Sequence, residues 1–332
     1  MFQSFDAASD PAAGPARLAA LRAVMAQRGL GGFVVPRGDA HQGETVAPRD
    51  ERLAWLTGFT GSAGACIALT DRAAVFVDGR YDLQVKDQVA DVYERLRVET
   101  TKPADWLREA APAGARIAYD PWLHGRDEVE RLRRAAEGAG AELVATENLV
   151  DLIWEDRPEA PLGALMPHPE ALAGRSSAAK RSDLGAALAE DGVAAAALTL
   201  PDSLAWLLNI RGADIPRNPI VQCFAILHGT GAVDLFVDPV KLDNVRTHFG
   251  PDVTCHAPEA FLDAVRALDG PVRLDKSSVP CIVADAVGER VDWGDDPCAL
   301  PKACKNAAEI DGTAEAHLRD GAAVVELLAW LD

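Results

Sequence analysis

The tetrapeptide Leu53-Ala54-Trp55-Leu56 returns in the second half of the chain as Leu204-Ala205-Trp206-Leu207. A second pair of matching words follows in the same order, Val75-Phe76-Val77-Asp78 and Leu235-Phe236-Val237-Asp238. Before each first word, apolar residues at helical spacing lead to a glycine-containing turn and then to an apolar run typical of a strand. The sequence therefore predicts an internal repeat, in which two copies of one α/β domain follow each other.

Strands and helices are expected to alternate in both copies. The predicted strands cover residues 33–35, 65–69, 74–77, 93–98, 116–119, 142–145, 193–200, 221–227, 233–237 and 272–274. The predicted helices cover residues 18–28, 50–56, 81–89, 103–111, 127–137, 184–191, 202–208, 240–249 and 258–268, with Asp50 and Asp202 as N-caps of two of them. Hairpin-like neighbours such as 65–69 and 74–77 favour mixed sheets over purely parallel ones.

Proline-rich breaks predict the domain boundaries. Four prolines in residues 154–177 mark a linker, so we expect one domain over 1–155, a second over 156–301 and a further segment over 302–332. From Asn306 onward, apolar residues recur at helical spacing, which predicts one long amphipathic helix. Its apolar face either docks back on the two domains or packs on something missing. Because no capping residue follows Asp332, we expect this helix to open a third, truncated domain.

Composition excludes several classes of function. The 332 residues carry a formal net charge of −18, which argues against nucleic acid and against anionic membrane surfaces as partners. No apolar stretch is long enough to span a membrane, and Met1 to Gly14 lacks the apolar core of a signal peptide. We therefore expect a cytoplasmic protein whose six cysteines are buried thiols.

No catalytic motif is recognisable from spacing alone. Gly61-Ser62-Ala63-Gly64 is not a nucleophile elbow, because that motif needs glycine where Thr60 stands. The seven histidines are isolated, and none lies near a carboxylate at metal-ligand spacing. The residues alone thus predict two α/β domains without an identifiable active site.

Three stretches nevertheless resemble one known family, the Xaa-Pro aminopeptidases (aminopeptidase P) in their long, three-domain form. They run from Arg52 to Gly64 and on through Phe76 to Gln84, from Asp202 to Pro219, and from Lys305 to Gly321. The resemblance implies two creatinase N-terminal-like domains followed by the first helix of a pita-bread catalytic domain.

The same resemblance implies an activity. Members of this metallopeptidase family are hydrolases that release the N-terminal residue from peptides with proline at the second position, using hydroxide held by two divalent metals, usually manganese. The family's metal ligands are two Asp, one His and two Glu, all downstream of the opening helix, so none can be carried over to this chain. We therefore expect no catalytic residue, no metal and no cofactor here. The chain alone is expected to be inactive, with roles in substrate access and in forming a homodimer.

Two groups of residues are predicted to face the substrate: Arg80 with Tyr81, and the turn that carries Arg211, Asp214 and Asn218. A structural role is the alternative for both, in which Arg80 closes a strand-to-helix turn and prolines stiffen the second loop. Trp55 and Trp206 are expected to be core anchors. The alternative function for the whole chain is a stand-alone, non-catalytic binding or oligomerisation module, and a hydrolase with a hidden site is a third possibility.

Overall fold

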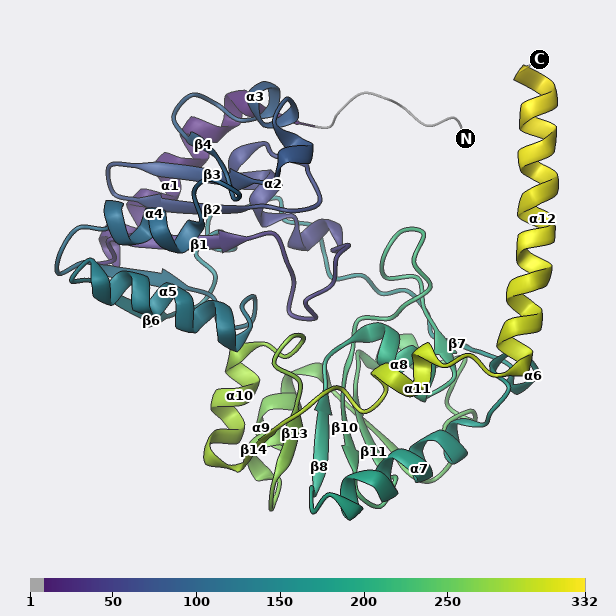
Figure 1. Ribbon diagram of the computed structural model, residues 1–332. Coiled ribbons are helices and arrows are strands. Elements are labelled where there is room, and N and C mark those ends of the chain that lie inside the picture. The colour runs from purple at the N-terminus through teal and green to yellow at the C-terminus, as the bar shows by residue number, and fades with distance from the viewer. Residues whose placement is uncertain (1–8, 332) are drawn as a thin grey trace. The chain divides into compact units, whose positions relative to one another are not determined.

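The computed structural model describes residues 9–331, which divide into two compact units (Figure 1). Unit 1 holds the described residues up to Pro161 together with Lys276–Asp285, and unit 2 holds Leu162–Asp275 and the chain from Ala286 onward. The expectation that no signal peptide is present falls largely on residues 1–8, which lie outside the described residues.

Unit 1 is built on a six-stranded sheet with the strand order β4-β3-β2-β1-β5-β6. Strand β2 is antiparallel to both of its neighbours, and the remaining pairs are parallel, so the prediction of a mixed sheet is confirmed. The strands are β1 (Gly32–Pro36), β2 (Ala65–Leu69), β3 (Ala73–Val77), β4 (Glu94–Arg97), β5 (Arg116–Tyr119) and β6 (Glu142–Ala145).

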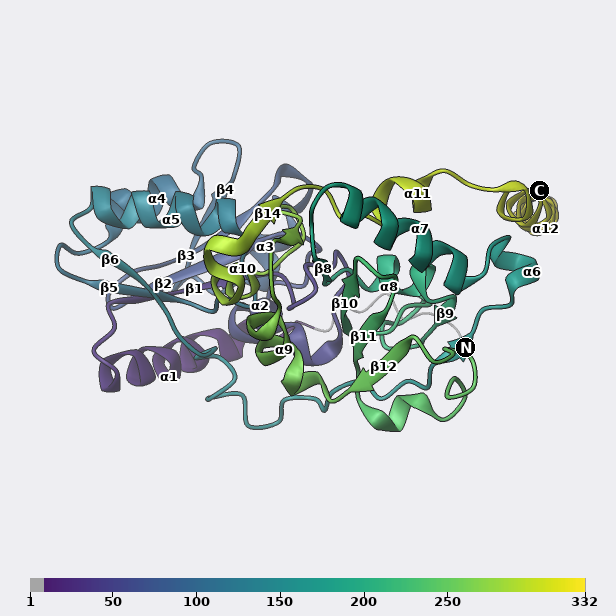
Figure 2. The same cartoon turned by 90° about the horizontal axis from the view of Figure 1, so that it is seen from below.

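Helices cover both faces of this sheet, with α1 on one side and α4 and α5 on the other (Figure 2). Alternate residues of β1 supply the two cores: Phe33 and Val35 pack in the cluster that holds the α1 side chains, whereas Val34 packs in the cluster that holds those of α4 and α5. The helices are α1 (Gly14–Gln27), α2 (Arg52–Thr57), α3 (Gln84–Gln88), α4 (Pro103–Ala110) and α5 (Arg126–Gly138).

Unit 2 repeats the same sheet with the order β12-β11-β10-β8-β13-β14. Strand β10 is antiparallel to both neighbours and the other pairs are parallel, as in unit 1. The strands are β8 (Ala195–Leu198), β10 (Phe224–His228), β11 (Val233–Phe236), β12 (Val253–His256), β13 (Val272–Leu274) and β14 (Val291–Trp293), beside a two-stranded sheet of β7 (Met166–Pro167) and β9 (Ile210–Arg211).

The helices of the second half differ more from those of the first. Most belong to unit 2, while α10 begins in the segment assigned to unit 1 and ends in unit 2. They are α6 (Glu170–Ala173), α7 (Ser177–Glu190), α8 (Pro201–Leu207), α9 (Phe261–Ala267), α10 (Cys281–Val287), α11 (Ala299–Ala303) and α12 (Ala307–Leu331).

The common strand order and directions confirm the predicted internal repeat. Backbone conformation repeats as well: the residue after α2 and the one shortly after α8, Gly58 and Asn209, both take positive φ, of 87° and 51°. The turns before β1 and β8 likewise contain Gly29 and Gly192 at φ 63° and 75°. Such conformations are costly for residues other than glycine and, to a lesser degree, asparagine.

Several predicted elements are wrong. Residues 240–249 form a short 3-10 helix over Pro239–Leu242 followed by turns, although apolar residues recur there at helical spacing. Asp50 does not cap α2, because its carboxylate accepts a hydrogen bond from Arg52 instead. Asp202 lies inside the first turn of α8. Of the cysteines, Cys255 and Cys304 are exposed rather than buried, since one lies on the edge strand β12 and the other just after α11.

The long final helix is confirmed as α12. Its apolar residues, among them Ile310, Leu318 and Trp330, are exposed, so this face does not pack on the rest of unit 2. The start of the helix is anchored beside α6, where Asn306 Nδ2 donates a hydrogen bond to the carbonyl of Ala173 (2.8 Å). The domain boundaries at residues 155 and 301 stay a prediction.

Candidate functional site

The candidate site is a pocket of about 550 Å³ in unit 2, between α8, the loop after β9 and the start of α12. We call it the α8–α12 pocket. Its wall includes one indole and an uneven set of charges, three cationic side chains against two carboxylates. The residues that matter for its chemistry are Trp206, Arg211, Lys302, Lys305, Asp202 and Glu309.

Trp206 forms the aromatic wall and shields a buried cation. The Nζ of Lys180 lies 4.3 Å from the centre of the Trp206 ring and donates hydrogen bonds to the Trp206 carbonyl (2.9 Å) and to Asn209 Oδ1 (2.8 Å). Burial lowers the pKa of Lys180 to about 8, against the opposing effect of the Glu309 carboxylate. Trp206 also packs against the core of unit 2, as a core anchor would. It therefore contributes both to the core and to the pocket wall.

Backbone carbonyls of nearby residues hold the Arg211 side chain in place. Its Nη1 donates to the carbonyls of Ile210 (2.8 Å) and Ala205 (3.2 Å). Burial lowers the pKa of Arg211, and Glu309 opposes that shift. An arginine remains charged despite such a shift, so the pocket keeps a fixed cation in its wall.

The remaining charges of the pocket come from the segment that enters α12. Lys302 forms an ion pair with Asp202, whereas Lys305 has no ion pair or hydrogen bond within residues 9–331. Asn306 and Glu309 form a capping box, in which Asn306 Oδ1 accepts from the Glu309 amide (3.1 Å) and Glu309 Oε2 accepts from the Asn306 amide (2.9 Å). This box fixes where α12 starts at the pocket.

The predicted substrate-facing residues of unit 2 separate into two groups. Arg211 and Asn218 both line the α8–α12 pocket. Asp214 does not line it: its buried carboxylate contacts Lys241 Nζ (2.6 Å) and accepts from the amides of Gln222 (2.7 Å) and Gly163 (3.1 Å). Asp214 thus stabilises the loop that carries the other two, while whether any of the three faces a substrate stays a prediction.

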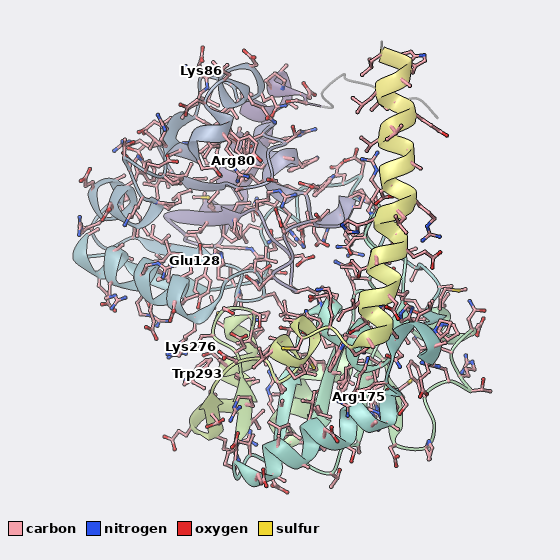
Figure 3. All side chains as sticks on the ribbon, turned by 45° about the vertical axis from the view of Figure 1, so that its right-hand side comes forward. Arg80, Lys86, Glu128, Arg175, Lys276 and Trp293 are labelled. Atoms are coloured by element: carbon pink, nitrogen blue, oxygen red, sulfur yellow. The ribbon has the colours of Figure 1, made fainter. Side chains whose placement is uncertain are left out.

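Arg80 and Tyr81 lie in unit 1, in the turn that follows β3, and Arg80 is on the surface (Figure 3). Arg80 makes two hydrogen bonds to the Asp78 carboxylate (2.8 and 3.0 Å), and these bonds lower the pKa of Asp78. The Tyr81 hydroxyl contacts Ser62 Oγ (2.6 Å), and this hydrogen bond lowers the pKa of Tyr81. Arg80 therefore has a structural partner in the turn itself, and Tyr81 has one in Ser62, which precedes β2.

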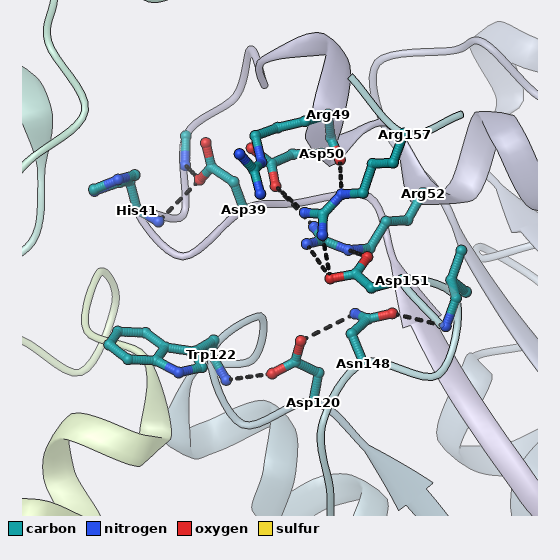
Figure 4. A network of polar contacts seen from close by, with 12 residues as sticks. Asp39, His41, Arg49, Asp50, Arg52, Asp120, Trp122, Asn148, Asp151 and Arg157 are labelled. Carbon is teal, nitrogen blue, oxygen red and sulfur yellow. Dashed lines mark hydrogen bonds and ion pairs between the residues drawn. The ribbon is translucent and has the colours of Figure 1, made fainter. Parts of the chain in front are cut away.

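An ion-pair network around the buried Arg52 in unit 1 was not predicted from the sequence (Figure 4). Arg52 donates through Nε and Nη2 to both oxygens of Asp151 (2.7 and 3.0 Å) and through Nη1 to Asp50 (2.9 Å). Arg157 Nη1 lies 2.6 Å from Asp151, and burial raises the pKa of Asp50 despite these cations. No spacing rule joins residues this far apart in the sequence. We interpret the network as a structural tie between α2 and the chain that leaves β6.

A second unpredicted cluster lies on the sheet of unit 2. His228 and His256, on β10 and β12, each place Nε2 2.7 Å from one oxygen of Asp234 on the intervening strand β11. The two hydrogen bonds lower the pKa of Asp234, against the opposing effect of burial. The histidines looked isolated in the sequence because the sheet, not local spacing, brings them to one carboxylate.

Within residues 9–331, no group of three or more His, Cys, Asp or Glu side chains is arranged to hold a metal ion. The described side chains therefore offer no donor set that fits a pair of divalent metals. No described helix combines the length and the apolar character needed to cross a membrane.

Known proteins share the sequence and the architecture of this chain. Family models described as "Creatinase/Prolidase N-terminal domain" match residues 17–153 and 156–309. The "Probable Xaa-Pro aminopeptidase P" of Coccidioides posadasii (strain C735) is 37% identical over 349 aligned positions, which cover 99% of this chain and 53% of the relative. "Aminopeptidase P1" of Lotus japonicus is 33% identical over 95% of this chain and 55% of its own length.

A solved structure agrees with these relatives. The X-prolyl aminopeptidase from Caenorhabditis elegans, described as a cytosolic enzyme with a di-nuclear active site, superposes with a TM-score of 0.89 at 29% identity. The match covers 96% of this chain and 56% of that protein, so the chain spans about half the length of the relatives it matches. The chain therefore belongs to the creatinase/prolidase family, of which it carries two N-terminal domains in succession, and over nearly its whole length it is similar to the Xaa-Pro aminopeptidases P.

Proposed function

We propose that this chain supplies the two N-terminal domains of an Xaa-Pro aminopeptidase, a hydrolase that releases the first residue from peptides with proline at the second position. The observation that carries the proposal is the similarity to the Caenorhabditis elegans X-prolyl aminopeptidase, because it extends over 96% of this chain rather than over one domain. The names of the curated relatives point to the same activity.

The chemistry is proposed to belong to the half of these relatives that this chain does not match. Two divalent metals, manganese above all, would bind there, and this chain would be inactive alone. Its two domains would limit access to short peptides and help to position the subunits of a cytoplasmic homodimer. The net charge of −18 supports a protein without nucleic acid or anionic membranes as partners.

The proposed division of labour within the chain follows the two family models. The boundaries at residues 155/156 and 301/302 separate the first domain, the second domain and the segment that leads into α12; the matches at 17–153 and 156–309 support the first boundary. Arg211 and Asn218 are the stronger candidates to meet a substrate, because they line a pocket, whereas Arg80 and Tyr81 are bound to Asp78 and Ser62.

The gene sequence downstream of codon 332 tests the proposal. A continuing reading frame with two Asp, one His and two Glu at the positions that hold the metals in the relatives is the expected result. A stop codon directly after Asp332 would contradict it and favour the stand-alone binding or oligomerisation module.

A further inference from the structure

The α8–α12 pocket is electrostatically unlike the rest of the molecule. The chain carries a net charge of −18, yet the pocket wall holds three cations, Arg211, Lys302 and Lys305, against two carboxylates, Asp202 and Glu309. Lys180 does not line the pocket: it lies behind the indole, where its ammonium group is bound to the Trp206 carbonyl and to Asn209 Oδ1. A positive hollow in an acidic protein concentrates anions.

The carboxylates of the pocket neutralise its positive charges only in part. Lys302 is paired with Asp202, and Glu309 lines the pocket together with Arg211, but Lys305 has no ion pair within the described part of the chain. The pocket also contains the N-terminal turn of the 25-residue helix α12, lined by Ala308, where backbone amides and the helix dipole favour negative charge. Among the side chains that line the pocket, three cations against two carboxylates leave one uncompensated positive charge, which matches one monovalent anion.

The lining of the pocket is also partly apolar. Trp206, Leu172, Pro219 and Ile220 belong to it. A volume of about 550 Å³ is in the range of sites that enclose a small organic ligand. The expected ligand therefore carries an anionic end and an apolar body.

We propose that the α8–α12 pocket binds a short peptide by its C-terminal carboxylate, with Arg211 and Lys305 on the carboxylate and Trp206 against the apolar body. A carboxylate fits better than a phosphate monoester, because a dianion would exceed the charge available and meet Glu309. The choice of a peptide, rather than another monocarboxylate, rests on the proposed function.

Calorimetric titration of the 332-residue chain tests this binding directly. The tripeptide Ala-Pro-Leu and its C-terminal amide are titrated in buffer with EDTA, so that binding is measured without metal-dependent cleavage. We expect the free acid to bind about tenfold more tightly than the amide, because the charge-assisted hydrogen bonds are lost with the amide. An excess of inorganic phosphate is expected not to displace the peptide.

Variants locate the site. Lys305→Gln and Arg211→Gln are each expected to weaken binding of the acid by about three- to tenfold and to leave binding of the amide unchanged. Arg246→Gln is the matched control, since it removes one exposed cation of unit 2 that does not line the pocket. Lys305 has no partner within residues 9–331, so Lys305→Gln keeps the test valid even where Arg211→Gln disturbs the loop.

The possible results separate the two proposals. Equal affinity for acid and amide, absence of binding by the wild-type chain, displacement by phosphate, or an affinity of Lys305→Gln equal to that of Arg246→Gln would each overturn the carboxylate site. None of these results bears on the aminopeptidase assignment, which depends on metal-dependent cleavage by the longer protein. Conversely, a stop codon after Asp332 would refute the proposed function and leave the carboxylate preference measurable.

Discussion

At the scale of single residues, two sets of partly or wholly buried charges are bound to partners distant in the sequence. Arg52 and Arg157 share Asp151 in unit 1, and His228 and His256 share Asp234 in unit 2. A buried charge that loses its partner costs more than an exposed pair contributes, because the remaining charge is left without solvent. Such residues are therefore the sites where single substitutions have the largest effects.

Arg52→Gln is expected to lower the free energy of unfolding by about 3 kcal/mol or more, since it leaves Asp151 and Asp50 near each other with one cation fewer. The matched control in the same unit is Arg72→Gln, which removes an exposed pair with Glu94 and is expected to cost less than about 1 kcal/mol. Urea unfolding of both variants checks this, and equal losses would show that the buried network contributes no more than a surface pair.

Asp234→Asn is expected to lose about 1–2 kcal/mol at pH 7 and progressively less in acid. The two histidines hold the folded-state pKa of Asp234 below the unfolded value of 3.8, so the ionised carboxylate stabilises the fold above that pH. This stabilisation is lost as the pH falls through the folded-state pKa. Unfolding free energies at pH 7 and pH 3.5 provide the measurement, with Asp243→Asn, which breaks an exposed pair, as control. A loss that does not depend on pH would contradict the assignment.

The residue scale is also where sequence reasoning was weakest. Arg211 and Asn218 were singled out through a family resemblance, and the structure places both at the pocket. Lys305, Glu309 and Lys180 were not, because the pocket lining comes from α6, α8, the loop after β9, α11 and α12, with Lys180 of α7 behind Trp206, and such a set leaves no spacing signal. Asp214 was chosen from the same motif, but its carboxylate is already bound to Lys241 and to the amide of Gln222.

At the scale of elements, the two units share strand order, strand directions and backbone conformations at equivalent positions. Apolar runs of β-forming residues fixed most central strands within one or two residues of the observed bounds, because burial on both faces leaves a continuous apolar signal. Edge strands β12 and β14 were missed, since Val253–His256 and Val291–Trp293 are half exposed and mix polar with apolar residues. Apolar residues at helical spacing predict a helix over residues 240–249. The prediction is wrong because the turns that form there bury apolar residues at the same spacing.

Two left-handed glycines that follow helices of unit 1, Gly58 and Gly29, allow a matched test. Gly58→Ala is expected to destabilise by at least about 2 kcal/mol more than Gly29→Ala, although both have positive φ. A Cβ at position 58 would lie 2.3 Å from the Gln88 carbonyl, whereas nothing lies within 4 Å of one at position 29. The cost at Gly29 should be the backbone strain alone, about 1 kcal/mol. Thermal unfolding of both variants measures the difference, and equal melting temperatures would contradict it.

At the scale of the whole molecule, the chain is a duplicated domain that ends in a helix with exposed apolar residues. It spans about half the length of relatives named as Xaa-Pro aminopeptidases. The central proposal is that these two domains bind and restrict peptides but do not cleave them. Peptide binding and peptide cleavage should therefore separate in this chain.

The most direct test is to incubate the chain with Ala-Pro-Leu and Mn²⁺ and to follow the intact tripeptide by mass spectrometry. The Caenorhabditis elegans enzyme serves as positive control. We predict that the peptide remains intact with the chain at concentrations at which the control removes the alanine completely. Manganese-dependent release of alanine by the chain, abolished by EDTA, would contradict the account.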